Sequence, residues 1–311
     1  MRHSDATWEK RGLVFSPRGR VPWAVHSALQ PTPVLLDEGT IRVFVGLRDE
    51  AGTSRVGFVD VDAADPSAVL GVSEEPVLDR GGEYTFDEHG VVPCAVVDRA
   101  GELYLYYAGY RRGTDPRFTV FGGLAVSRDR GRSFERVSRV PVLDRTDGEL
   151  LFRVLHSILF EGGVWRVWYG AGSRFARGSD GKSLPVYDIR YMESPDGRTF
   201  PRHGRTCLTL RGDEYRVGRP YVIRAGSAYQ MYFCAGSERT GYRLAYAESP
   251  DGVAWDRRDE DLGLDVSPAG WDSEMMAYPA VVRAPGGTYL FYNGNKYGYD
   301  GFGYAVRRSS P

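Results

Sequence analysis

The sequence predicts an all-β fold built from repeated units of roughly 60 residues. Runs of alternating β-branched and aromatic residues dominate the 311-residue chain, and Gly, Pro, Asp and Ser bound these runs. No window longer than about ten residues shows the 3.6-residue period of an amphipathic helix. Two kinds of sequence marker also recur at near-constant spacing, which indicates repeats rather than a general excess of strands.

The first marker is a pair of residues, aromatic in at least the second position, near the end of a strand. From the second member of each pair, the steps along the chain are 63, 62, 64 and 59 residues. The second marker introduces an apolar strand and advances by 60, 63, 64 and 59 residues. The pairs are Val43-Phe44, Tyr106-Tyr107, Trp168-Tyr169, Tyr232-Phe233 and Phe291-Tyr292, and the strand-introducing residues are Pro33, Pro93, His156, Pro220 and Pro279. Repeats of this kind are typical of β-propellers.

Each unit reads as four strands: a Pro-led strand, an aromatic strand, a strand of small residues, and a fourth after an Asp turn. In the turns we expect Asp129, Asp196 and Asp251 to accept backbone hydrogen bonds while Gly adopts positive φ. The prediction is one domain, a five-bladed β-propeller with four-stranded antiparallel blades. The expected blades cover approximately residues 22–80, 81–143, 144–209, 210–266 and 267–311.

The fifth unit ends after its third strand. Residues 6–12 resemble the fourth strands of the other units, around Thr199-Phe200 and Ala254-Trp255. We therefore expect the N-terminal strand to complete the last blade and close the ring. Closure would remove a free sheet edge, which is an aggregation risk.

Composition argues against several classes of protein. The net charge of −1 gives no overall attraction to nucleic acid or membranes. No run approaches the ~20 apolar residues of a membrane span, and the first ten residues lack a secretory h-region. Three widely spaced cysteines, Cys94, Cys207 and Cys234, predict a reduced cytoplasmic protein, with Cys94 and Cys234 in the core. We expect no cofactor or metal, and a monomer or weak oligomer.

The loops that precede the first strand of each unit, here called leading loops, should converge on one rim of a propeller. Four of the five leading loops carry carboxylates, and two carry arginine. Paired carboxylates in a concave site suit glycosidic bond cleavage, one as acid and one as base or nucleophile. The candidates are Asp87, Glu88, Asp272 and Glu274. The alternative is that the carboxylates form rim salt bridges with Arg153, Arg216 and Arg219.

The arginines predict an anionic feature on the ligand, such as a phosphate, a nucleotide diphosphate or a uronate. The predicted substrate-binding residues are His26, Gln30, His89, Arg153, His156, Arg216, Arg219, Tyr278, Asn293, Asn295 and Tyr297. Each histidine has a structural alternative, and Asn-Gly pairs also serve as turns. Arg48 and Arg55 are equally interpretable as rim ligands or solvated side chains.

Seven short motifs carry a family resemblance that covers nearly the whole chain. They are QPTP at 30–33, TFDEHGVVP at 85–93, RP at 219–220, DSEM at 272–275, YP at 278–279, YNGN at 292–295 and GFG at 301–303. With these motifs the chain resembles the five-bladed propeller glycoside hydrolases of families 43, 32, 68 and 130. It resembles more closely the bacterial "glucosyl hydrolase-like" proteins of polysaccharide and natural-product gene clusters. In the family 43 pattern a catalytic Asp lies on the first strand of blade 1, where this chain has His26 and Gln30.

The resemblance implies an enzyme that acts on a glycosidic or glycosyl-phosphate bond of a small, anionic sugar. Asp87 and Glu274 are the favoured acid/base pair, with Asp272 tuning or positioning. Family 130 phosphorylases use a comparable basic cluster for phosphate, so phosphorolysis stays open. The alternatives are a propeller that binds a sugar or sugar nucleotide without cleaving it, and a recruited natural-product enzyme with other acid/base chemistry.

Overall fold

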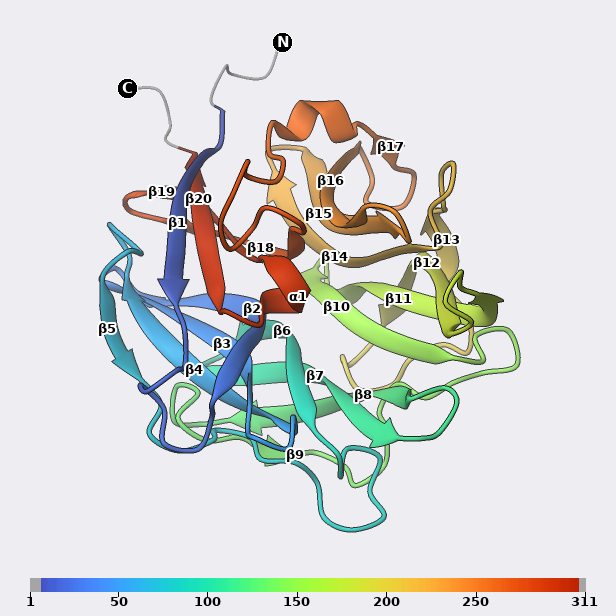
Figure 1. Cartoon of the computed structure of the whole chain (residues 1–311), viewed down its shortest axis with the longest axis horizontal. Coiled ribbons are helices and arrows are strands. Elements are labelled where there is room, and N and C mark those ends of the chain that lie inside the picture. Colours follow the sequence, from blue (N-terminus) through green and yellow to red (C-terminus); the bar gives the residue numbers. More distant parts are fainter. Residues whose placement is uncertain (1–6, 308–311) are drawn as a thin grey trace.

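The computed structural model describes residues 7–307, and strands account for most of them (Figure 1). Three sheets have four strands each. In sheet order they are β2 (His26–Asp37), β3 (Thr40–Arg48), β4 (Ser54–Asp62) and β5 (Val69–Val72); then β6 (Val91–Arg99), β7 (Glu102–Arg112), β8 (Phe118–Ser127) and β9 (Glu135–Arg136); and β1 (Glu9–Phe15), β20 (Phe302–Arg307), β19 (Gly287–Asn293) and β18 (Ala277–Ala284).

A further sheet has eight strands. They are β10 (Phe152–Glu161), β11 (Val164–Arg177), β12 (Ser183–Ser194), β13 (Arg205–Leu208), β14 (Arg216–Ala225), β15 (Ala228–Ser237), β16 (Gly241–Ser249) and β17 (Asp256–Arg257). Its halves meet at one parallel pair, Tyr187 with Arg216, and every other pairing is antiparallel. We therefore describe five units: β2–β5, β6–β9, β10–β13, β14–β17, and β18–β20 with β1. The short helices are η1 (Asp259–Leu262) and α1 (Asn295–Gly298).

The first strand of each unit lies nearest the middle of the molecule (Figure 1). Contacts run from β2 to β6, from β6 to β10, from β10 to β14, from β14 to β18, and from β18 back to β2. The hydrophobic core fills the spaces between neighbouring units. One cluster, for example, joins Val43 and Val59 of the first unit to Phe291 and Tyr304 of the last. The sheets therefore pack face to face around a shared centre.

The N-terminal strand pairs with the last unit, as the sequence predicts. β1 runs antiparallel to β20, with Lys10 opposite Ala305 and Leu13 opposite Gly303. The strand covers Glu9–Phe15 rather than residues 6–12, because its apolar end continues to the fully buried Phe15. Residues 1–6 lie outside the described part of the chain.

Deletion of residues 1–12 is expected to lower the melting temperature sharply. The deletion takes away most of β1, frees the edge of β20, and removes the Lys10 ammonium that lies 2.8 Å from the buried Asp272 carboxylate. Differential scanning calorimetry measures the effect, and a chain lacking only residues 1–5 is the control. An unchanged melting temperature would show that β1 adds little to the last unit.

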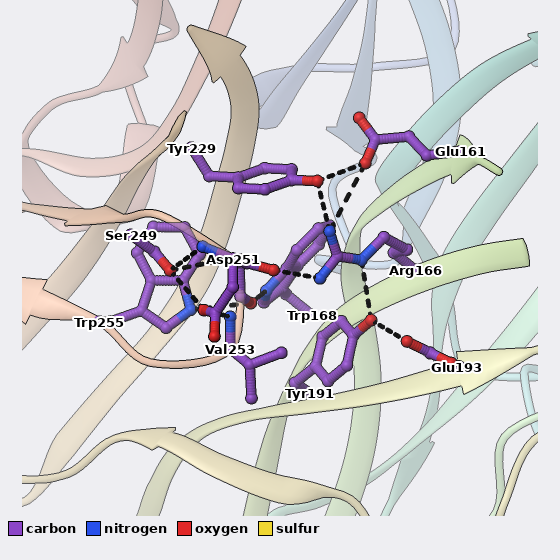
Figure 2. A network of polar contacts seen from close by, with 11 residues as sticks. Glu161, Arg166, Trp168, Tyr191, Glu193, Tyr229, Ser249, Asp251, Val253 and Trp255 are labelled. Atoms are coloured by element: carbon purple, nitrogen blue, oxygen red, sulfur yellow. Dashed lines mark hydrogen bonds and ion pairs between the residues drawn. The ribbon is translucent and has the colours of Figure 1, made fainter. Parts of the chain in front are cut away.

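The Asp turns have the predicted structural role. Asp251 Oδ1 accepts the N–H groups of Val253 (2.8 Å) and Ala254 (2.9 Å), as Figure 2 shows for Val253. Asp129 and Asp196 make equivalent bonds in their units. The backbone N–H of Thr199 helps to lower the pKa of Asp196 to about 2. These aspartates are therefore held ionised as parts of turns.

The same end of the molecule carries a polar network between the third and fourth units (Figure 2). Arg166 on β11 donates to the hydroxyl of Tyr191 (2.8 Å) within its own unit. It also donates to the Tyr229 hydroxyl and to the Asp251 carbonyl in the next unit. Tyr229 in turn donates to Glu161 over 2.6 Å. This network stabilises the contact between units at the end opposite the leading loops.

Candidate functional site

Five side chains from the five first strands form the candidate site, which we call the central cluster: Gln30, Cys94, His156, Arg219 and Tyr278. Each lies at a register irregularity of its strand, where the pairing with the second strand skips a position. Gln30, Arg219 and Tyr278 also have positive φ values of 54°, 55° and 59°. Bulges re-aim side chains, and strained non-glycine residues concentrate at functional sites.

Arg219 is the charged member of the central cluster. Its guanidinium is buried and donates to the Cys94 carbonyl and, over 3.2 Å, to the Thr32 hydroxyl. Its Nε has no hydrogen-bond partner. Within residues 7–307 no carboxylate forms an ion pair with it, and burial lowers the pKa of the guanidinium. An arginine remains protonated even so, and the centre therefore holds a buried positive charge without a counter-charge.

His156 and Cys94 are the neutral neighbours of this charge. Burial and the Arg219 guanidinium hold the pKa of His156 well below its usual value, and its Nδ1 has no partner. Burial raises the pKa of the Cys94 thiol to about 11, and the thiol donates to Gln30 Oε1 over 3.5 Å. The histidine is therefore an uncharged imidazole beside a guanidinium.

Aromatic side chains line one side of the centre around Arg216. The Arg216 guanidinium lies 3.8 Å from the centroid of the Tyr242 ring and donates to the Tyr297 hydroxyl over 2.9 Å. Tyr278 stacks on Tyr297 with their centroids 6.4 Å apart. Arg216 Nε lacks a partner, as Arg219 Nε does. Tyr297 is partly exposed, so this aromatic group reaches the surface of the molecule.

The predicted convergence of the carboxylates on the centre is wrong for Asp87. Its side chain is fully buried inside the second unit. It accepts the Tyr107 hydroxyl of the second strand over 3.0 Å and forms an ion pair of 2.7 Å with Arg136 of the fourth strand. These contacts tie the leading loop to the sheet and direct the carboxylate away from the centre.

Asp272 and Glu149 make the same kind of contact. Asp272 accepts the Tyr292 hydroxyl over 3.0 Å and pairs with Lys10 of the strand that completes its unit. Glu149 accepts the Tyr169 hydroxyl over 2.7 Å and is also ion-paired. We call each of these arrangements a carboxylate–tyrosine clamp. These contacts hold Asp272 within the last unit; its predicted tuning or positioning role stays a prediction.

The clamps leave a signal in the sequence that the prediction missed. In all three clamps the tyrosine follows its carboxylate by 20 residues. In the fourth unit Phe233 replaces the tyrosine, and Glu214 is held by Arg257 through bonds of 2.6 and 3.0 Å. A carboxylate at a constant offset from the marker aromatic in three units indicates a repeated internal contact, because a catalytic pair would not recur in several units.

Two other predicted residues, Glu88 and Arg153, have side chains engaged elsewhere, and Glu274 lies exposed. Glu88 pairs with Arg111 (3.0 Å) and His89 (3.3 Å). Glu274 is exposed, and it is held through its backbone N–H and carbonyl groups. Arg153 belongs to the Glu149 clamp and donates to the Pro201 carbonyl over 2.6 Å. The structure does not bring Asp87 and Glu274 together as a pair.

The two predicted asparagines support the backbone. Asn293 is buried, accepts the Gln30 N–H over 2.7 Å, and donates to the carbonyls of Ala28 and Gly301. Asn295 accepts the N–H groups of Glu274 and Met275. Both side-chain oxygens are occupied by backbone donors, which corrects their assignment to sugar hydroxyls.

His26 and His89 lie at the rim rather than in the centre. His26 stacks on Tyr299 with centroids 4.8 Å apart. His89 lines a cavity of 440 Å³ together with Arg48, Arg112 and Arg117, and no carboxylate residue lines that cavity. Arg48 is therefore a rim residue, whereas Arg55 is paired with Asp49 and Asp79. In residues 7–307 no group of three or more His, Cys, Asp or Glu could hold a metal ion.

No protein-family model matches the sequence. The chain is 34% identical over 300 residues to the uncharacterized protein Rv1502 of Mycobacterium tuberculosis strain H37Rv, covering 96% of this chain and 98% of that protein. The uncharacterized protein MT1551 of Mycobacterium tuberculosis strain CDC 1551 is 33% identical with the same coverage. The chain belongs to their family.

The family shares its fold with solved glycoside hydrolases. One solved glycoside hydrolase has a TM-score of 0.73 at 19% identity, and the match covers 98% of this chain and 94% of that protein. A structure from the GH130 family of mannoside phosphorylases has a TM-score of 0.73 at 15% sequence identity. That match covers 99% of this chain and 95% of the other protein. A thermostable family-43 glycoside hydrolase has a TM-score of 0.67 at 15% sequence identity, and the match covers 93% of this chain and 97% of that protein. The predicted resemblance to propeller glycoside hydrolases of families 43 and 130 is confirmed at the level of fold.

The described part of the chain contains no helix that is long and apolar enough to cross a membrane. Four predicted binding residues, Gln30, His156, Arg219 and Tyr278, come together in the central cluster. Cys94, which the sequence assigned to the core, is the fifth member. Arg216 and Tyr297 lie beside them.

Proposed function

We propose that this protein is a glycoside hydrolase-like enzyme that acts on a glycosidic or glycosyl-phosphate bond of a small anionic sugar. Its five units would be the blades of one propeller domain, with β1 completing the last blade. The observation that carries the proposal is the buried Arg219 guanidinium, which has no carboxylate partner and an unpartnered Nε. The fold of the solved relatives supports the sugar class.

A buried charge without a partner costs several kcal/mol, because the protein interior solvates it poorly. A ligand that brings a phosphate or carboxylate to Arg219 would remove this cost on binding. Guanidinium groups bind such oxyanions through two parallel hydrogen bonds. Arg216 Nε offers a second unpartnered donor nearby in the site. The centre thus favours an anionic ligand over a neutral one.

His156 is the proposed proton-transfer group. It is held neutral, so it can accept a proton at neutral pH, and its Nδ1 is unpartnered. An anion bound beside Arg219 would raise the low pKa of the imidazole. The imidazole could then take a proton from a water that forms the new bond to the anomeric carbon, and pass that proton to the leaving oxygen as the glycosidic bond breaks. Tyr278 provides a stacking surface for the sugar ring and a hydroxyl beside it. This assignment replaces Asp87 and Asp272, whose carboxylates are held in clamps.

A second candidate is binding without cleavage. It is favoured by the engagement of Asp87, Glu149 and Asp272 inside their units, which leaves Arg219 without a neighbouring carboxylate. In that case the centre would recognise an anionic sugar or sugar nucleotide and release it unchanged. The free thiols of the three cysteines support a reducing, cytoplasmic setting for either function.

A substrate screen separates the two candidates. Glycosyl phosphates, sugar nucleotides and aryl glycosides are incubated with the protein, with and without inorganic phosphate, and released sugar and thermal stabilisation are both measured. Turnover of an anionic sugar supports the enzyme, whereas stabilisation without turnover supports the binding protein. If neutral glycosides bind as well as their phosphorylated counterparts, the proposed role of the centre is wrong.

A further inference from the structure

An apolar cavity lies beside the central cluster, between the second and third units. Its volume is 710 Å³. The β7–β8 hairpin, the leading loop of β10 and the β11–β12 hairpin form its walls. The apolar side chains that line it include Phe118, Val120, Leu150, Leu151, Phe152 and Phe175. Ligand cavities commonly have volumes of about 300–1,000 Å³ and mostly apolar walls.

Three of these side chains are exposed despite their size. Leu150 is 55% exposed, Phe118 46% and Phe175 37%. They come from three separate segments of two units, yet all three line the one cavity. Single exposed apolar residues are ordinary, whereas several that gather around one cavity mark a binding surface.

The inner wall of the cavity packs against the central cluster. Tyr110, Val120 and Phe152 pack on the small buried group that contains Cys94, and the Cys94 carbonyl accepts the Arg219 guanidinium. Tyr110 also contacts Phe118, with ring centroids 5.9 Å apart. Residues that line the cavity therefore contact the group around Cys94, and Cys94 in turn contacts Arg219. One layer of packed side chains, that of Tyr110, Val120 and Phe152 on the Cys94 group, therefore lies between the cavity and the Arg219 site.

Cationic side chains are also part of the lining of this cavity. Arg117, Arg145 and Lys182 line it, with Asp115 as the one acidic residue among the lining side chains in the described chain. Arg117 and Phe118 also line the 440 Å³ basic cavity at the rim. An apolar wall bordered by guanidinium groups suits a molecule that joins an anionic part to an apolar part.

We propose that this cavity is the subsite for an apolar group carried by the sugar ligand, so that the natural ligand is an amphipathic anionic glycoside. The proposal rests on the proposed function for its anionic part, because Arg219 would hold the anion while the cavity holds the apolar group. It assigns a substrate class that the fold alone does not specify.

Two series of ligands test the apolar subsite and the anionic centre separately. One series is alkyl phosphates from methyl to octyl, and the other is alkyl glucosides of the same lengths. Their dissociation constants are measured by calorimetry below the concentration at which the octyl compounds form micelles. In both series we expect affinity to rise about three- to fourfold per methylene, the factor that corresponds to burial of each group. At a fixed chain length, the difference between the two head groups reports on the anionic centre.

The double variant Leu150→Gln, Phe175→Gln is expected to flatten both series. Both side chains are exposed, so the substitutions should not disturb folding, and affinity for inorganic phosphate should not change. Leu70→Gln on β5 is the matched control, because Leu70 is 57% exposed and lies outside the cavity. The control should keep the full chain-length dependence.

Three outcomes would overturn the proposal. The dissociation constants could be independent of alkyl chain length, or their dependence on chain length could survive in the double variant. In the third outcome, the double variant loses the dependence on chain length and also changes its oligomeric state. The last outcome would make the cavity wall an interface between copies of the chain. Equal affinity for phosphates and glucosides, with the chain-length dependence intact, would refute the anionic centre and leave the apolar subsite standing.

Discussion

Arg219→Met is expected to weaken binding of anionic sugars by at least about 100-fold and to leave the ligand-free protein folded. Removing one partner of a buried, hydrogen-bonded charge pair typically costs about 2–5 kcal/mol of binding free energy. Without ligand, however, the guanidinium is already a buried charge without a carboxylate. An apolar side chain of similar length removes that desolvation cost. The lost bonds to the Cys94 carbonyl and Thr32 hydroxyl offset part of this gain.

Calorimetric titration with a glycosyl phosphate and thermal unfolding without ligand measure the two effects. Arg219→Lys keeps the charge but lacks the planar fork, so we expect intermediate binding. Arg132→Met, at an exposed position in a β8–β9 turn, is the matched control and should change neither quantity. Unchanged affinity combined with a large loss of stability would show that Arg219 only links the first strands together.

Glu149→Ala is expected to destabilise the protein by about 3–5 kcal/mol, the usual effect of removing one partner of a buried ion pair. The Glu149 side chain is 0% exposed and that of its partner Arg153 is 4%. Glu149 also accepts the Tyr169 hydroxyl and a bond from Arg190. Its removal leaves the Arg153 guanidinium buried without a counter-charge. Urea unfolding followed by tryptophan fluorescence measures the change.

Asp87→Asn should also lower stability, because the neutral amide pairs less well with Arg136 and Tyr107. Glu102→Ala is the control: its partner Arg128 is exposed, and such pairs contribute about 0–1 kcal/mol. If either clamp variant kept full stability while losing turnover, the carboxylates would regain the catalytic role that the sequence suggested.

The sequence by itself determined the strands and their grouping. Aromatic pairs recur every 59 to 64 residues because each occupies the same place in the second strand of its unit, where burial demands a large side chain. The missing fourth strand of the last unit and the role of Asp251 were also predictable, since strand pairing and turn hydrogen bonds depend on local pattern.

Only the tertiary structure decided which side chains reach the centre. Asp87 lies in a loop, where no periodicity specifies the direction of a side chain, and its clamp partners Tyr107 and Arg136 are 20 and 49 residues away. Cys94 is fully buried, as its apolar strand predicted, but the sequence did not show that its position, at the register irregularity between Pro93 and Ala95, places its thiol on Gln30 and its carbonyl on Arg219. Alternation along a strand predicts which face of the sheet a side chain lies on only where the strand pairing is regular. At the bulges, the packing of the five first strands around one centre determines which way each side chain points.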